Sequence, residues 1–259
     1  MIAWQDVTVR HGDRATVDRV SLTVAPGERV AIVGPNGAGK TSLLRAALAL
    51  LRPAEGAVLV DGSDTVSLDA RARAARVAWL PQTLRRAEPI PVRVAVAAAR
   101  FRFDESRTAR DAAVMSALTA AGVAHLADRS VSSLSGGEAQ RVALAGLVAQ
   151  DAATWLLDEP GNHLDPAVQR STFSFLAAAA DAGRTLIVVT HDVELLGWLA
   201  APGQADRVRV VGMKAGAVSL DVRLDDPTLP ELMSTLLGVR VHRLELDGRT
   251  QLVLGAALA

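Results

Sequence analysis

The chain has 259 residues, half of them hydrophobic, which is enough for one large domain or one domain with a small satellite and argues against disorder. Its formal net charge is zero, so neither nucleic acid nor an anionic membrane surface is favoured as a partner. Cysteine is absent, which excludes disulfides and thiolate metal sites. We expect no signal peptide or membrane span, because no basic start precedes an apolar run and no apolar stretch approaches the roughly 20 residues that a bilayer requires.

Short β-branched runs, each followed by a helical stretch, predict an α/β domain with a largely parallel sheet. Two alternating stretches, Val7–Arg10 and Ser21–Val24, predict half-exposed antiparallel strands near the N-terminus. The predicted buried strands are Arg29–Val33, Arg76–Leu80, Thr154–Asp158 and Leu186–Thr190. A helix is predicted from Lys40 to about Leu51.

From about Leu84 to Gln150 the sequence is rich in Ala and Arg with helical periodicity, which predicts a helical subdomain inserted into the α/β core. A tail follows from Gln204. Its predicted elements are strands near Arg207–Val211 and Ala217–Val222, a helix near Leu229–Gly238, and strand pairing around Asp247-Gly248.

A glycine-rich segment joins the first buried strand to the first helix. It reads Gly34-Pro35-Asn36-Gly37-Ala38-Gly39-Lys40-Thr41 and has the spacing of a phosphate-binding loop. Glycines are needed because backbone N–H groups must turn inward around phosphate oxygens, where a Cβ would obstruct them. Lys40 would reach the β- and γ-phosphates and Thr41 would ligate Mg²⁺, with Ser42 beside it in the same site. A glycine turn that merely caps a helix is the alternative.

Two adjacent carboxylates, Asp158 and Glu159, follow the apolar residues Thr154–Leu157. Ligand sites of a parallel sheet lie beyond the carboxyl ends of its strands. We therefore expect Asp158 near the Mg²⁺ that Thr41 holds, and Glu159 near the water that attacks the γ-phosphate. Acidic residues that cap a following helix are the alternative.

The segment Leu134-Ser135-Gly136-Gly137-Glu138-Ala139-Gln140-Arg141 begins the last helix of the predicted helical subdomain. Ser135 and Glu138 have the spacing of a capping box, and a well-capped helix N-terminus suits a γ-phosphate. This octet resembles the signature of the ABC ATPase family. Together with the phosphate loop and the acid pair, the resemblance covers the chain from about Ile2 to Val211.

The resemblance implies an α/β fold of the P-loop NTPase (RecA-like) type, with an antiparallel β subdomain and an inserted helical subdomain. Residues 1–83 and 151–203 would form the nucleotide-binding core, residues 84–150 the helical signature subdomain, and residues 204–259 a C-terminal extension. The implied activity is hydrolysis of ATP with Mg²⁺, coupled to transmembrane transport.

Further residues take roles from the same resemblance. Gln82 is similar to the glutamine that contacts Mg²⁺ and water at the hinge to the helical subdomain, and His191 to the histidine that senses the γ-phosphate. Asp165 ends a loop, Asn162-His163-Leu164-Asp165, that would cross to a partner subunit, although Asp165-Pro166 is equally an ordinary helix start. Ser135, Gly136, Gly137 and Glu138 would contact the ATP of that partner.

One position departs from the family. An aromatic residue, often tyrosine, usually stacks on adenine some two dozen residues before the phosphate loop, and this chain has His11 there. An imidazole has a smaller π face and a charge that varies near neutral pH. A stacking role and a purely structural role are both open.

The chain carries one set of motifs, so a second nucleotide-binding subunit is expected, most simply another copy. A separate integral membrane permease is implied, docking near Gln82 and Pro89–Arg100, with a substrate-binding protein as an indirect partner. The expected location is the cytoplasmic face of the cell membrane, as a peripheral subunit that binds no nucleic acid.

Two segments point to a substrate class. Pro91–Arg100 is similar to a stretch in importers of iron-siderophores, haem and cobalamin, although Ala99-Arg100 replaces their usual Gly-Arg. Residues Leu229–Met233 and Gly238–Val241 also look like the C-terminal extension of those importers, and simple helix packing could explain both segments. The rival functions are import of a different substrate and a soluble ABC ATPase in iron–sulfur cluster assembly or cell division. DNA-maintenance and translation-factor members are disfavoured, because long coiled coils and a second motif set are both missing.

Overall fold

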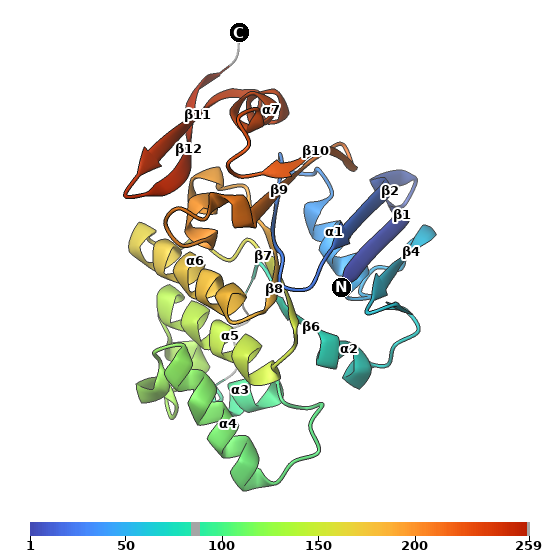
Figure 1. Cartoon of the computed structure of the whole chain (residues 1–259). Coiled ribbons are helices and arrows are strands. Elements are labelled where there is room, and N and C mark those ends of the chain that lie inside the picture. Colours follow the sequence, from blue (N-terminus) through green and yellow to red (C-terminus); the bar gives the residue numbers. More distant parts are fainter. Residues whose placement is uncertain (84–88, 258–259) are drawn as a thin grey trace.

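A six-stranded sheet forms the centre of the computed structural model, which describes residues 1–83 and 89–257 (Figure 1). The strand order is β10-β9-β3-β8-β7-β6, and β10 is the one antiparallel strand, at the edge. These strands are β3 (Arg29–Val33), β6 (Val77–Leu80), β7 (Thr154–Asp158), β8 (Thr185–Val189), β9 (Val208–Lys214) and β10 (Ala217–Arg223). Every residue of β3, β7 and β8 is buried, as expected for parallel strands covered on both faces.

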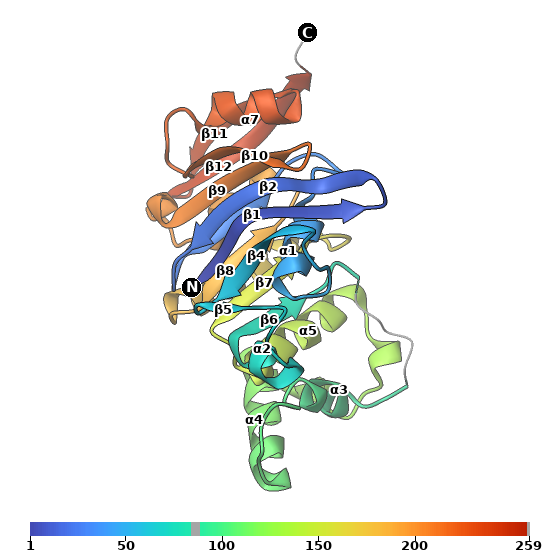
Figure 2. The same ribbon diagram turned by 90° about the vertical axis from the view of Figure 1, so that its right-hand side faces the viewer.

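A four-stranded antiparallel sheet lies beside the central one (Figure 2). Its order is β2-β1-β4-β5, with β1 (Ile2–His11), β2 (Arg14–Val24), β4 (Glu55–Val60) and β5 (Ser63–Asp64). Helix α1 (Lys40–Ala47) shares one buried cluster with residues of both sheets. Within it the indole Nε1 of Trp4 donates a hydrogen bond to the carbonyl oxygen of Leu43 at 3.1 Å. The antiparallel sheet therefore supports the helix that follows the phosphate loop.

The helices between β6 and β7 have a buried cluster of their own. They are α3 (Val92–Ala98), α4 (Arg107–Ala120) and α5 (Gly136–Gln150), with short 3₁₀ turns at Ala124–Leu126 and Val131–Ser133. Arg100 stabilises the end of α5, because its Nη1 donates to the carbonyl oxygen of Ala149 at 2.8 Å while its Nε donates to Glu105 at 2.7 Å. Helix α5 is thereby held at its C-terminal end by a cation.

Helix α6 (Pro166–Asp181) and the 3₁₀ segment η3 (Val193–Leu199) contribute to the main buried cluster on the central sheet. The C-terminal segment adds α7 (Leu229–Leu237) and a hairpin of β11 (Val239–Leu246) and β12 (Arg249–Ala257), seen at the top of Figure 1. Leu229, Met233 and Leu252 are fully buried in that cluster. The C-terminal segment is thus packed onto the body, and the division into three units stays a prediction.

Several elements differ from the sequence-based prediction. Helix α1 ends at Ala47 rather than near Leu51, because Ala49 has a left-handed backbone (φ 53) and the N–H groups of Leu50 and Leu51 both turn back to Arg45. Strand β4 and helix α2 (Ala70–Arg76) were not predicted at all. The predicted start of the helical subdomain at Leu84 lies outside the described residues.

The contact between η3 and β12 gives a test of how the C-terminal segment docks. A Cβ built on Gly197 would lie 2.1 Å from the carbonyl oxygen of Thr250, a backbone atom that cannot move alone. We expect Gly197→Ala to lower the unfolding free energy by roughly 1–3 kcal/mol through overpacking. Thermal unfolding, with limited proteolysis of the C-terminal hairpin, measures the effect.

Gly146 supplies the matched control. It lies inside α5 with open space around the built Cβ, so Gly146→Ala should instead raise the unfolding free energy by about 1 kcal/mol through helix propensity. Equal stability of the two alanine variants would contradict the docking described here.

Candidate nucleotide-binding site

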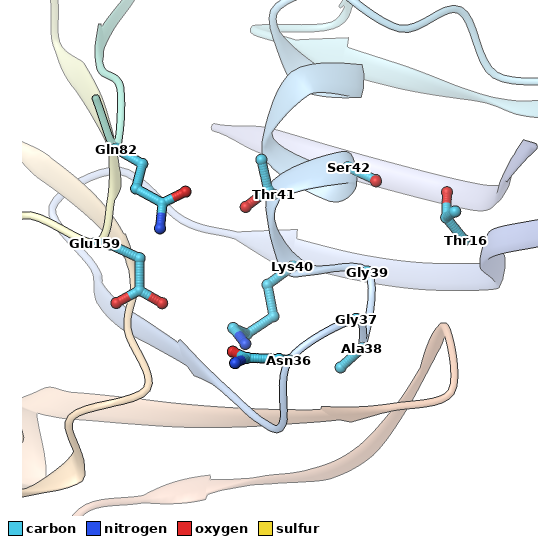
Figure 3. A pocket seen from close by; sticks show the side chains of 10 residues that line it. All are labelled: Thr16, Asn36, Gly37, Ala38, Gly39, Lys40, Thr41, Ser42, Gln82 and Glu159. Carbon is cyan, nitrogen blue, oxygen red and sulfur yellow. The ribbon is translucent and has the colours of Figure 1, made fainter. Parts of the chain in front are cut away.

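A cavity of about 240 Å³ opens where β3 ends and α1 begins (Figure 3). Its walls come from β2, the glycine-rich loop, the start of α1 and the segments that follow β6 and β7. The lining residues are Thr16, Asn36, Gly37, Ala38, Gly39, Lys40, Thr41, Ser42, Gln82 and Glu159. Figure 3 shows Gln82 and Glu159 facing Thr41 and Lys40 across the gap.

The loop must contain glycine because its neighbours are backbone atoms at very short range. Gly34 (φ 146) and Gly39 (φ 100) have left-handed conformations. A Cβ on Gly34 would lie 2.2 Å from the carbonyl oxygen of Met213, and one on Gly39 would lie 2.1 Å from that of Thr16. No side chain fits at either position, which is the condition that a phosphate-binding loop of backbone N–H groups requires.

The turn between β9 and β10 holds this loop from outside. The N–H of Gly216 donates to the carbonyl oxygen of Ala38 at 3.1 Å, and the carbonyl oxygen of Gly216 accepts from the N–H of Asp18 at 2.9 Å. One turn therefore bridges the loop and β2. Three segments that lie far apart in the sequence, namely β2, the glycine-rich loop and the β9–β10 turn, are thus joined by backbone hydrogen bonds.

Lys40 lies at the first position of α1 and is almost fully buried. Its Nζ donates to the carbonyl oxygens of Gly34 at 2.7 Å and Pro35 at 3.1 Å. Burial lowers the pKa of this ammonium group, and the negative charges of Glu159 and Asp158 oppose that change. A phosphate group beside Lys40 would supply further negative charge and so favour the charged form of this buried ammonium group.

Asp158 lies at the end of β7 and is 1% exposed. Its Oδ1 accepts a hydrogen bond from the hydroxyl of Thr41 at 3.0 Å. Burial raises the pKa of this carboxyl group, and the Thr41 hydrogen bond opposes the rise. A buried carboxylate beside a hydroxyl oxygen forms an oxygen-only arrangement in which a hard cation would offset the uncompensated charge.

These two oxygens fit Mg²⁺, which is usually bound through one or two carboxylates and the phosphates of a substrate. The described part of the chain contains no group of three or more His, Cys, Asp or Glu side chains suited to a metal ion.

Glu159 and His191 form a close pair at the neighbouring strand ends. Asp158 is paired with Val189 in the sheet, so the residues that follow both strands meet at the same edge. The Oε2 of Glu159 lies 2.7 Å from Nδ1 of His191 and accepts a hydrogen bond from the backbone N–H of His191 at 3.3 Å. Glu159 itself has a left-handed backbone, with φ 53, which is uncommon for a residue that is not glycine.

The signature residues lie at the start of α5, outside the lining of this cavity. Ser135 accepts a hydrogen bond from the N–H of Glu138 at 3.3 Å, while Oε2 of Glu138 accepts from the N–H of Ser135 at 2.8 Å. This is the predicted capping box. Gly136 lines a second, smaller cavity together with Gln82 and His163. Ser135 is exposed, so the helix N-terminus is open to a ligand from outside the subunit.

Two further predicted residues have visible structural positions. Asp165 caps α6, because its Oδ1 accepts from the N–H groups of Ala167 at 3.1 Å and Val168 at 3.0 Å, and its role toward a partner stays a prediction. His11 is exposed at the tip of the β1–β2 hairpin, opposite Arg14, and does not line the cavity at the glycine-rich loop. Its adenine-stacking role stays a prediction as well.

Thr16 and Gln140 were missed by sequence reasoning. Thr16, on β2, lines the cavity at the glycine-rich loop. Gln140 is buried, and its Nε2 donates a hydrogen bond to the carbonyl oxygen of Pro160 at 2.7 Å. Thr16 gave no signal because its role depends on strand register. Gln140 lay within the recognised octet, but no local pattern reveals a buried amide that bonds across to another loop.

Comparison with known proteins gives a consistent family. The model of the family described as ABC transporter matches residues 17–162. The Hemin import ATP-binding protein HmuV of Pseudomonas fluorescens (strain Pf0-1) is 36% identical over 249 residues, covering 93% of this chain and 94% of that protein.

Solved structures agree with the fold. A dimeric ATP-binding cassette in a post-hydrolysis state bound to ADP and Pi has a TM-score of 0.75 at 26% identity, covering 86% of this chain and 99% of that one. A chain from a transporter of proposed metal-chelate type, in an inward-facing conformation, has a TM-score of 0.81 at 21% identity and covers 98% of this chain and 96% of that one. The predicted α/β fold of the ABC ATPase type is confirmed.

The buried carboxyl group of Asp158 generates a prediction about pH. Its pKa is raised in the folded chain, so the folded state binds this proton more tightly than the unfolded state does. The resulting stability is present at low pH and is lost as pH rises through the folded pKa. Asp158→Asn removes the ionisation and keeps an oxygen for the Thr41 hydroxyl. We expect the nucleotide-free variant to melt at a higher temperature than the wild type at about pH 7, with the difference shrinking toward about pH 4.

Asp165→Asn is the control, because asparagine also caps a helix and Asp165 is exposed. Its melting temperature should follow that of the wild type throughout the pH range. A variant Asp158→Asn that is no more stable than the wild type at neutral pH would refute the assignment of a costly buried charge.

Proposed function

Because the chain belongs to the ABC transporter family, we propose that its ATPase activity powers the import of a metal chelate such as haem through a separate membrane permease. The observation that carries the substrate class is the similarity to a hemin import protein along almost the whole of both chains, C-terminal segment included. The family membership makes the chain an ATP-binding and ATP-hydrolysing transporter subunit. An iron-siderophore or cobalamin cargo belongs to the same proposal.

We assign the cavity at the glycine-rich loop and the start of α1 to MgATP. The N–H groups of Gly37 and Gly39 and the ammonium of Lys40 would hold the β- and γ-phosphates, in line with the positive end of α1. Thr41 and Asp158 would hold Mg²⁺, with Gln82 at the opposite wall. Mg²⁺, when bound, neutralises charge on the β- and γ-phosphate oxygens.

Glu159 is assigned to orient and polarise the attacking water. It lines the cavity across from Lys40, and its carboxylate is fixed by two contacts to His191. His191 is more than half exposed, so it can reach both that water and the γ-phosphate while holding Glu159. Proton transfer or polarisation by a positioned carboxylate contributes typically about 10²–10⁴-fold to a rate.

A second nucleotide-binding subunit completes the proposed site. Ser135, Gly136 and Gly137 begin a capped helix whose N-terminus is exposed and outside the subunit's own cradle, so they would bind the ATP of the partner. The similar cassette bound to ADP and Pi is described as dimeric. The simplest partner is a second copy of this chain.

The proposed permease would dock beside Gln82 and α3, at the cytoplasmic face of the membrane. None of the helices in the described ranges 1–83 and 89–257 meets the length and apolarity that a membrane span requires. Val94 on α3 and Phe101 just after it are about half exposed, which suits a docking surface. A substrate-binding protein would deliver the cargo to that permease.

The proposed mechanism of ATP hydrolysis is tested by Glu159→Gln. Removing the carboxylate should lower the turnover of ATP by about 10²-fold or more while leaving the Lys40 and Thr41 contacts to the nucleotide in place. We expect the variant to accumulate as an ATP-bound dimer, visible by size-exclusion chromatography with ATP and Mg²⁺.

Glu194→Gln is its control, since Glu194 is an exposed carboxylate of η3 whose backbone N–H donates to Asp192. That variant should hydrolyse ATP like the wild type. A Glu159→Gln protein with wild-type turnover would exclude the assigned role.

The transport part is tested with partners. A tagged chain purified from detergent-solubilised membranes should retain a hydrophobic permease, and its ATPase rate in liposomes should rise when a haem-loaded binding protein is added. Retention of a soluble scaffold protein instead would favour the alternative, an ATPase of iron–sulfur cluster assembly or cell division. Stimulation by a different cargo would keep the import function and replace the substrate.

A further inference from the structure

Two glutamines tie helix α5, which begins with the signature residues, to the central sheet. Gln140 donates from Nε2 to the carbonyl oxygen of Pro160 at 2.7 Å. Gln150, the last residue of the helix, donates from Nε2 to the carbonyl oxygens of Ala74 at 3.0 Å and Val77 at 2.9 Å. The two ties are separated by about 15 Å of helix. Gln150 is bound to the start of β6, whereas Gln140 is bound to the segment that follows β7 and contains Glu159.

The Gln140 tie acts on the residue next to Glu159. Gln140 is 7% exposed, and a buried amide that loses its partner is costly, so this hydrogen bond is strongly constrained. Gln169, on α6, donates to the carbonyl oxygen of Gly161 at 3.0 Å. Two side-chain amides from two different helices therefore hold the two consecutive carbonyl groups that follow Glu159.

The backbone at Glu159 needs such support. Its φ of 53 is a left-handed conformation that costs about 1 kcal/mol or more for a residue with a Cβ, and the N–H of Glu159 is held by the carbonyl oxygen of Val189. The carboxylate direction depends on that backbone. Whatever holds Pro160 therefore helps to set where the carboxylate of Glu159 points.

We propose that Gln140 is a positioning residue that couples the signature helix to Glu159. The N-terminus of α5 would bind the partner's ATP, and Gln140 lies five residues farther along the same helix. When the signature helix moves, the Gln140–Pro160 hydrogen bond carries that movement to the turn that orients the catalytic carboxylate. This inference rests on the proposed role of Glu159 and adds a route by which occupancy of one ATP site reaches the chemistry of the other.

The first test compares Gln140→Met with Gln150→Met in the purified full chain. Methionine has nearly the shape of glutamine and no donor. We expect Gln140→Met to lower kcat about tenfold with the KM for ATP changed less than about twofold, because the phosphate loop is untouched. Gln150→Met also loses two partly buried hydrogen bonds and should lower the melting temperature, yet keep kcat within about twofold of the wild type. Equal losses of kcat in the two variants would reduce Gln140 to a packing residue and overturn the proposal.

The second test uses Gln140→Glu and remains informative where Gln140→Met fails to fold. A carboxylate cannot donate to the carbonyl oxygen of Pro160, whereas a protonated carboxyl group can. The kcat of Gln140→Glu relative to wild type should therefore rise as pH is lowered from about 8 to about 5.5, and the relative kcat of Gln140→Met should stay flat. Glu159, His163 and His191 are the other ionisable side chains around this site, and Gln140→Met, which adds no charge, shows whether they alone change the relative rate with pH. A flat ratio for Gln140→Glu would count against the coupling.

Wild-type turnover separates this inference from the function on which it rests. A wild-type chain without ATPase activity, or a Glu159→Gln variant with full activity, would overturn the proposed function itself. An active wild type with an inactive Glu159→Gln variant and an unaffected Gln140→Met variant would overturn only the role of Gln140.

Discussion

The edge of the central sheet at which the site residues meet depends on a glycine-rich loop that passes other backbone atoms at close range. Gly34 and Gly39 have left-handed backbones and lie against the carbonyl oxygens of Met213 and Thr16, so no larger residue fits. The parallel pairing of the strands brings the other site residues to the same place. Because β3, β7 and β8 are neighbours and run in one direction, the loop after each strand meets the others at one edge. Lys40, Asp158, Glu159 and His191 are gathered there by topology alone.

The same gathering places two ionisable groups in an environment that disfavours their charged forms. Burial lowers the pKa of Lys40 and raises that of Asp158, so each group is held where its charged form is disfavoured. Nucleotide and metal would offset both charges at once. The site thus resembles many active sites, in which stability of the free protein is sacrificed to binding and chemistry.

Much of this arrangement could be predicted because the relevant signals are local. The strands Arg29–Val33 and Thr154–Asp158 were predicted with their observed bounds, since each contains a short apolar run next to a distinctive polar segment. Strand β4 was not predicted because Glu55-Gly56-Ala57 gives no strand signal, and the strand depends on its pairing with β1 and β5. The role of Thr16 and the Gln140–Pro160 hydrogen bond were not predicted for a related reason, because both depend on contacts between segments that no short sequence pattern describes.

The contacts of the two loop glycines also determine which substitutions the loop can accept. Each glycine is confined by a main-chain carbonyl, from Thr16 in one case and Met213 in the other. A carbonyl oxygen stays in place whatever side chain its residue carries. A smaller side chain at Thr16 or Met213 would therefore leave the backbone contact unchanged and would make no room for a side chain at Gly34 or Gly39. The path of the main chain, and not the size of the neighbouring side chains, limits what the loop can contain.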